Sequence, residues 1–90
     1  MKLNSKHKNT LKAIYDNPVR SDLDWQRIES LLFALGAELS EGRGSRIRVA
    51  LNDVRAVFHR PHPQKETDKG ALMSVRRFLK AAGITPSKMK

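Results

Sequence analysis

The sequence contains no cysteine, so it can form neither a disulfide bond nor a thiolate metal site, and a reducing compartment is its natural location. No apolar run approaches the ~20 residues of a membrane span. Lysines occur near the N-terminus, but the apolar stretch of a secretory signal does not follow them. These absences predict a cytoplasmic protein without a membrane partner.

Motifs for cofactor and nucleophile chemistry are also missing. The chain has no glycine-rich phosphate loop, no paired carboxylates and no nucleophile motif. His59 and His62 lie three residues apart with no third ligand nearby, which is not the spacing of a metal site. We therefore expect neither a metal ion nor a small-molecule cofactor.

What the chain does contain is positive charge. Eighteen Lys and Arg residues stand against 9 Asp and Glu, a net charge of +9 on 90 residues. The charge is about +4 over residues 1–20, −4 over 21–42, +3 over 43–59 and +6 over 60–90. Such an excess on a small domain favours a polyanion partner, most simply nucleic acid. The alternative is a basic protein whose charge serves only solubility or bulk association with the ribosome, and charge alone does not distinguish RNA from DNA.

The clearest structural signal is a β-hairpin over residues 46–59. Asn52-Asp53 separates two runs rich in Val, Ile, Leu and Phe, and both residues tolerate the positive φ of a two-residue turn. This turn pairs Arg46 with His59 and puts both on one face. A slip of one residue would bury the arginines, so the register is well specified. The apolar face comprises Ile47, Val49, Leu51, Val54, Ala56 and Phe58; the other carries Arg46, Arg48, Arg55 and His59, with Ala50 and Val57 between them.

Hydrophobic periodicity and capping residues predict three helices and one further strand. The helices cover residues 5–16, 24–35 and 70–82, and the strand covers 37–41. The element order is therefore α-α-β-β-β-α. It predicts an α+β two-layer sandwich, in which a three-stranded antiparallel sheet carries helices on one face.

The whole chain, 1–90, is predicted to be a single domain with a core over 24–83 and a tail over 84–90. Trp25 begins the apolar stripe of the second helix, so we expect it in the core rather than on a stacking platform. Arg76, Arg77 and Lys80 are expected on the outside of the third helix.

Three segments carry a family resemblance. They are IESLLFALGAEL at 28–39, the Gly44-Ser45 pair that opens the second strand, and RPHPQKETDKGALMSVRRFLKAAGI at 60–84. The last is the most specific, because it joins a P-H-P-x-K-E core to a helix opened by K-G-x-L. On these segments the chain resembles the HicA family of bacterial toxins.

The resemblance implies a fold similar to the double-stranded-RNA-binding domain. It also implies a metal-independent endoribonuclease that binds and cleaves mRNA without the ribosome and is silenced by a HicB-type antitoxin. The helix predicted over residues 5–17 is an addition to the minimal family pattern.

One position departs from the family. The Gly-Ser pair is usually followed by a histidine taken as catalytic, but here Arg46 follows it. An arginine stays protonated and cannot accept the proton of a ribose 2′-hydroxyl, although it can bind a phosphate. We therefore predict that His59, opposite Arg46, is the catalytic base, since its positive neighbours favour the neutral imidazole. The alternative is an exposed histidine that contacts RNA or nothing.

The predicted RNA contacts extend beyond this pair. His62 matches the histidine of the family loop and either positions the loop, contacts a phosphate or is only structural. Lys65 and Lys69 are predicted phosphate contacts, with a solvated loop charge as the alternative. The full predicted RNA-binding set is Arg46, Arg48, Arg55, His62, Lys65, Lys69 and Arg76.

Three functions are compatible with these features. The first is a toxin-like ribonuclease, and the second is an RNA-binding domain that has lost cleavage. The third treats the basic surface as a docking site for an acidic antitoxin or another protein. The replacement at Arg46 shifts weight from the first function to the second.

Overall fold

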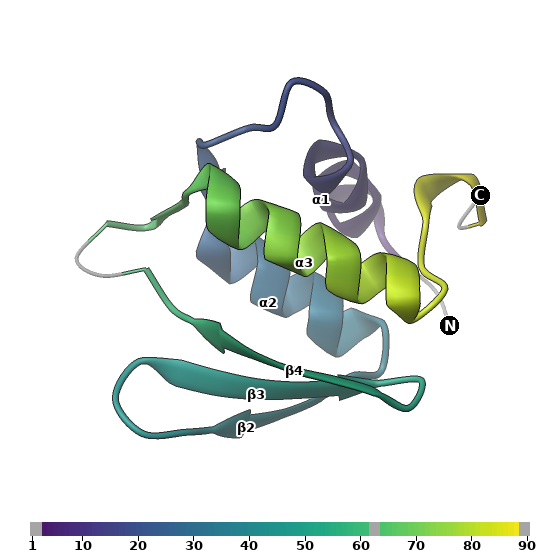
Figure 1. The fold of residues 1–90 in the computed structure, drawn as a ribbon. Coiled ribbons are helices and arrows are strands. Elements are labelled where there is room, and N and C mark those ends of the chain that lie inside the picture. The colour runs from purple at the N-terminus through teal and green to yellow at the C-terminus, as the bar shows by residue number, and fades with distance from the viewer. Residues whose placement is uncertain (1–2, 62–63, 89–90) are drawn as a thin grey trace.

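The structure, a computed structural model, describes residues 3–61 and 64–88 (Figure 1). Its helices are α1 (Ser5–Ile14), α2 (Trp25–Ala34) and α3 (Lys69–Ala81), followed by a short 3-10 helix, η1 (Pro86–Lys88). Its strands are β1 (Leu23–Asp24), β2 (Glu38–Glu41), β3 (Arg46–Leu51), β4 (Val54–His59) and β5 (Glu66–Thr67). The predicted α+β class and the order of the main elements are confirmed, and two very short strands are added.

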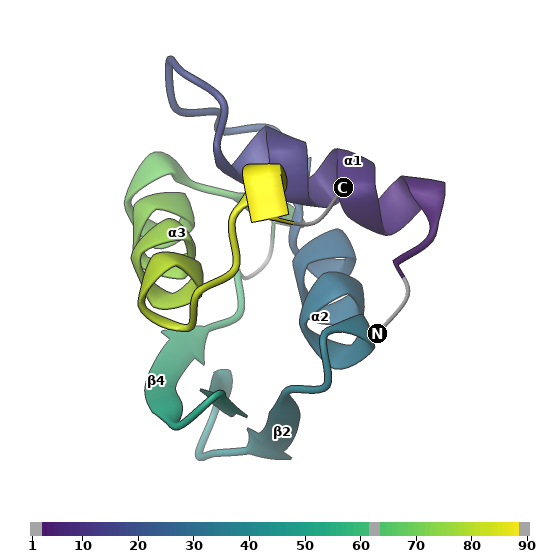
Figure 2. The same ribbon diagram turned by 90° about the vertical axis from the view of Figure 1, so that its right-hand side faces the viewer.

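The main elements form stacked layers. Strands β2, β3 and β4 make an antiparallel sheet in that order, and α2 and α3 lie side by side on one of its faces (Figures 1 and 2). Helix α1 crosses the far side of α2 and α3 (Figure 2). Because no described helix covers the second face of the sheet, that face is open to solvent.

The hairpin has the predicted register, pair for pair. Asn52 and Asp53 have φ values of 51° and 67°, as a primed two-residue turn requires. Arg46 pairs with His59 at the open end of the ladder. At the turn, the side-chain nitrogen of Asn52 donates to the carbonyl oxygen of Ala82 at 2.8 Å, which ties the tip of the hairpin to the end of α3.

The apolar face of the hairpin packs on the helices. Phe58 lies between two other aromatic rings, with its ring centre 6.0 Å from that of Trp25 and 5.7 Å from that of Phe78, both edge to face. Trp25 is only 4% exposed, so its predicted core position is confirmed. This cluster holds β4 against both helices and thereby fixes the direction of the opposite face of the sheet.

The helix ends follow ordinary capping chemistry. Asp24 caps α2 by accepting from the backbone N–H of Gln26 at 2.9 Å, and Asp68 caps α3 by accepting from Ala71 at 2.7 Å. The cap of α1 is Asn4, whose side chain accepts from the backbone N–H of His7 at 2.8 Å.

A second, two-stranded sheet was not predicted. Leu23 pairs with Thr67, Asp24 pairs with Glu66, and the backbone N–H of Trp25 donates to the carbonyl of Lys65 at 2.9 Å. These contacts fasten the segment that precedes α3 to the beginning of α2. They fix the position of residues 65–67, just before α3.

The predicted external position of Arg76 is wrong. Its side chain is 7% exposed and points toward α1, where its Nε donates to the carbonyl of Ile14 at 2.8 Å and its Nη2 to that of Asp16 at 2.7 Å. Its Nη1 donates to the Asn17 side chain at 3.3 Å, and its guanidinium lies 5.8 Å from the centre of the Tyr15 ring. Arg76 therefore caps the C-terminal end of α1, and we remove it from the predicted RNA-binding set.

Candidate nucleic-acid interface

The open face of the sheet carries the cations that the hairpin register predicted. Arg46, Arg48, Arg55 and His59 are all exposed there, and we call these four residues the arginine platform. Val57, which is 52% exposed, and Ala50 lie among them. Since directly opposed residues share a face, the pairing of Arg46 with His59 brings these two side chains to the same surface.

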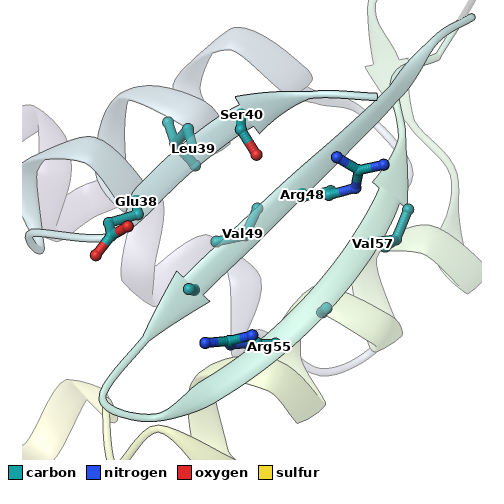
Figure 3. A pocket seen from close by; sticks show the side chains of 9 residues that line it. Glu38, Leu39, Ser40, Arg48, Val49, Arg55 and Val57 are labelled. Atoms are coloured by element: carbon teal, nitrogen blue, oxygen red, sulfur yellow. The ribbon is translucent and has the colours of Figure 1, made fainter. Parts of the chain in front are cut away.

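Strand β2 extends this surface on one side. Ser40 pairs with Arg48, which pairs in turn with Val57, and Glu38 joins Ala50 and Arg55 in the same way. These rows line a shallow hollow of about 540 Å³ across the three strands (Figure 3). The hollow is cationic along β3 and β4 and has one carboxylate, that of Glu38, at the β2 side.

The row that contains Arg46 and His59 lies beyond the end of β2, next to Gly42. The backbone N–H of Gly42 donates to the Arg46 carbonyl at 2.9 Å. A Cβ at position 42 would lie 3.0 Å from the Cβ of Arg46, closer than side chains normally approach. Gly42 therefore leaves the space in which the Arg46 side chain stands beside His59, whose Cβ lies ~5 Å from that of Arg46 in such a pair.

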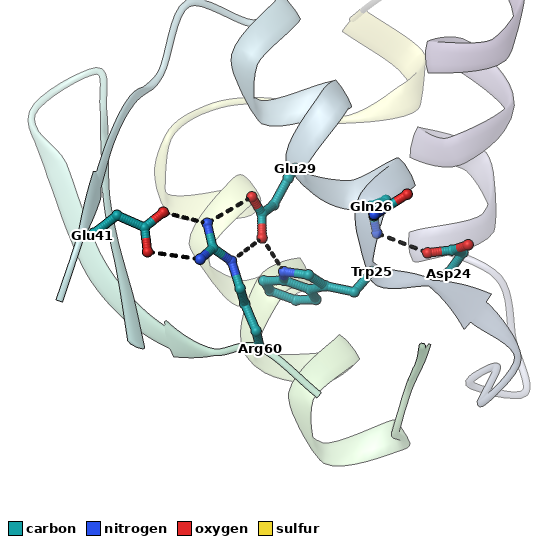
Figure 4. A network of polar contacts seen from close by, with 6 residues as sticks. All are labelled: Asp24, Trp25, Gln26, Glu29, Glu41 and Arg60. Carbon is teal, nitrogen blue, oxygen red and sulfur yellow. Dashed lines mark hydrogen bonds and ion pairs between the residues drawn. The ribbon is translucent and has the colours of Figure 1, made fainter. Parts of the chain in front are cut away.

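Arg60, the residue after His59, is not part of the platform. Its guanidinium binds two carboxylates, Glu29 on α2 and Glu41 on β2 (Figure 4). The Nε to Glu29 distance is 2.7 Å, and the two bonds to Glu41 are 2.8 and 2.9 Å. The Trp25 indole N–H also donates to Glu29, so the network reaches the core cluster.

This network shifts the pKa values of Arg60 and Glu41. The hydrogen bonds that Arg60 donates to Glu29 and Glu41 raise the pKa of Arg60 above its usual value. Conversely, the hydrogen bond from Arg60 lowers the pKa of Glu41. With two carboxylates already bound, Arg60 has little free charge to offer a phosphate, and it instead anchors the end of β4 and the start of the loop that follows.

Arg60 is the first residue of the 60–84 family segment, but the sequence analysis predicts no role for it. A usable signal was present, because the acidic residues of the chain concentrate in the predicted second helix and the strand after it. An arginine at the end of the hairpin was the nearest partner for two of them.

The loop residues of the prediction have different outcomes. His62 lies outside the described residues. Lys65 and Lys69 are exposed, with Lys69 as the first residue of α3 and Lys65 just before β5. Their phosphate contacts stay predictions, and neither lies on the strands that form the arginine platform.

Within residues 3–61 and 64–88, no group of three or more His, Asp or Glu side chains has the arrangement to hold a metal ion. In the same ranges, none of the helices has the length and apolar character needed to cross a membrane.

These features define a class, a small and strongly basic α+β protein whose three-stranded sheet leaves one charged face open. Comparison with protein families makes the class specific. Residues 25–84, well over half of the chain, match the family described as the HicA toxin of bacterial toxin–antitoxin systems. The chain belongs to the HicA toxin family, as the resemblance predicted. No curated protein and no solved structure matches it significantly, so the likeness to a double-stranded-RNA-binding domain stays a prediction.

Proposed function

We propose that this toxin binds RNA through the arginine platform and cleaves it there. The observation that supports the proposal most directly is the exposed row of Arg46 and His59 on an uncovered sheet face, next to two further arginines. Guanidinium groups bind phosphate oxygens through paired, charge-assisted hydrogen bonds. A platform with three of them suits the backbone of a nucleic acid. The family resemblance supports RNA rather than DNA as the ligand.

The chemistry that suits this row is attack by the ribose 2′-hydroxyl on the adjacent phosphate. His59, as a neutral imidazole, accepts the 2′-hydroxyl proton while the O2′–phosphorus bond forms. The bond to the 5′-oxygen then breaks, and that oxygen takes a proton from solvent, which leaves a cyclic 2′,3′-phosphate. Arg46 remains charged throughout and stabilises the negative charge that grows on the phosphate oxygens.

The same surface is compatible with two other functions. If His59 does not act as a base, the platform binds RNA without cutting it. If the platform instead docks an acidic protein, a HicB-type antitoxin is the partner that the family implies. We propose that such an antitoxin neutralises the toxin in any case, and that mRNA in the cytoplasm is the target.

The salt dependence of binding tests the RNA interface. We expect the parent chain to bind single-stranded RNA with an affinity that falls steeply with salt. In a plot of log affinity against log salt concentration, each phosphate contact adds ~0.7 to the steepness of the slope. Replacing Arg48 and Arg55 by Gln should lower that slope by about 1.4, because two such contacts are lost. The matched control replaces Arg77 and Lys80, two exposed cations on α3, by Gln and should leave the slope unchanged.

Two results would contradict the proposal. A shallow slope for the parent chain would exclude phosphate neutralisation and favour the protein-docking alternative. Equal effects of the platform variant and the α3 control would show that net charge, rather than the platform, determines binding.

A further inference from the structure

Helix α1 lies outside the residues that match the HicA family, and its surface is the feature that the proposed function leaves unexplained. It covers the side of α2 and α3 that faces away from the sheet (Figure 2). Its lysines, Lys6, Lys8 and Lys12, are all exposed, and none of its ten residues is acidic. The far side of the molecule from the arginine platform therefore also carries concentrated positive charge.

The placement of these lysines opposes helix stability. Lys8 and Lys12 are four residues apart and lie on the same side of α1, where like charges repel. Lys6 and Lys8 also fall within the first four residues, at the end of the helix where the peptide dipoles already place positive charge. Lys8 is thus unfavourable for the helix in both ways, and an exposed position at which a sequence breaks local rules is a candidate for function.

A polar cleft lies beside Lys6, the one of these three lysines that lines it. It measures about 410 Å³ and lies between the first half of α1 and the start of α2. Ser30 provides an exposed hydroxyl group, 3.0 Å from the Nε2 of His7. Thr10 is only 1% exposed; it donates to the Lys6 carbonyl at 3.0 Å and accepts from the Arg27 Nε at 3.2 Å, so it positions Arg27. The cleft also contains a carboxylate, Asp24, which is engaged as the N-cap of α2.

We propose that α1 and this cleft form a second RNA-binding surface, which takes the phosphates of a different RNA segment from the one on the arginine platform. Lys8 and Lys12 contact the backbone, and Arg27 with Lys6 and the Ser30 hydroxyl binds a phosphate that enters the cleft. The two surfaces face away from each other across the helix layer, so one protein molecule bridges two RNA segments. The inference rests on the proposed RNA binding by the platform and adds a second RNA-binding surface on the same molecule.

A bridging assay with the full chain tests this proposal. One single-stranded RNA is immobilised, the protein is added, and a second, fluorescently labelled RNA is then captured only if the protein binds both. We expect the parent chain to capture the second strand. The variant Lys8→Gln/Lys12→Gln should capture at least tenfold less of the second strand, while it still binds the first strand.

The matched control is Arg77→Gln/Lys80→Gln, which removes the same charge from the exposed side of α3. It should capture the second strand as the parent chain does. A circular dichroism melt of each variant shows that the fold persists, since all four positions are exposed.

The outcomes separate this proposal from the platform itself. A parent chain that binds one RNA strand but never captures a second overturns the second surface and leaves the platform intact. Undiminished capture by the α1 variant overturns it too, because bridging would then come from self-association of the protein. Equal losses in the α1 variant and the α3 control would assign the effect to net charge and would also overturn it. A parent chain that binds no RNA refutes both proposals.

Discussion

Arg46 and His59 stand directly opposite each other on β3 and β4, with both side chains on the open face of the sheet. By the family resemblance, a histidine is expected at the position of Arg46, and in this chain a histidine lies across the ladder from it. A residue type that can act as a base and one that can bind a phosphate are therefore both present in this pair.

The first prediction concerns cleavage. Replacing His59 by Ala should slow RNA cleavage by about 10²–10⁴-fold, because a positioned general base is lost. The measurement is single-turnover cleavage of a labelled RNA at saturating protein. Arg55→Gln is the control, and it should weaken binding while the saturated rate stays close to that of the parent chain. Cleavage by the His59 variant at the parent rate would place the base elsewhere.

The second prediction concerns Gly42. Replacing Gly42 by Ala puts a Cβ 3.0 Å from that of Arg46 and should displace the Arg46 side chain from its present position. RNA affinity should fall by up to about tenfold, the value of one charge-assisted hydrogen bond. Equilibrium binding at fixed salt measures this loss.

Gly44 offers a contrast in the same loop. It has a φ of +62° and open space where a Cβ would be, so Gly44→Ala should cost about 1 kcal/mol of stability and little RNA affinity. If both glycine variants lose affinity equally, crowding at Arg46 is not the cause.

The third prediction concerns pH. Because Arg60 lowers the pKa of Glu41 in the folded state, Glu41 adds stability above its unfolded value of 4.5, and this stability is lost as the pH falls through the lowered folded pKa. The parent chain should therefore be more stable than Glu41→Gln at pH 7. The difference should shrink below pH 4.5 and vanish in stronger acid.

Urea unfolding of both proteins across this range checks the third prediction. A stability difference that stays constant down to strong acid would mean that Glu41 stabilises the fold through side-chain packing rather than through its charge. Glu38→Gln serves as the control, since no ion pair within the described residues involves Glu38.

The fourth prediction concerns Arg76. Its replacement by Met leaves the carbonyls of Ile14 and Asp16 without the donors they now have, which should cost about 3 kcal/mol of stability. Chemical denaturation measures this cost. Arg77→Met is the matched control, because Arg77 is the next residue on α3 and is exposed. Equal effects of the two changes would contradict the capping role of Arg76.

The comparison of sequence with structure shows which interactions are local enough to predict. Asn52-Asp53 fixed the hairpin because a two-residue turn sets the register of everything that follows it. From that turn alone, the pairing of Arg46 with His59 and the sorting of the two faces could be predicted. The same reasoning could not detect β1 and β5, which are two residues long and far apart in the chain.

The wrong prediction for Arg76 and the missed role of Arg60 have one physical cause. Helical periodicity places Arg76 next to the apolar line of α3, but whether it is exposed depends on α1, whose docking position the periodicity does not give. Likewise, the role of Arg60 appears only when Glu29 and Glu41 are brought together in space. For a long side chain at the border of a buried stripe, the tertiary partners determine whether it is exposed or bonded.

The bond from the Asn52 side chain to Ala82 has a consequence for recognition. It immobilises one extremity of the β3–β4 ribbon, while the clamp made by Arg60 immobilises the other. The strands of the cationic face are thus held at both ends before any ligand arrives, so we expect little ordering entropy to be lost on association. Capture of RNA should proceed in one kinetic step, with an observed rate that rises linearly with RNA concentration.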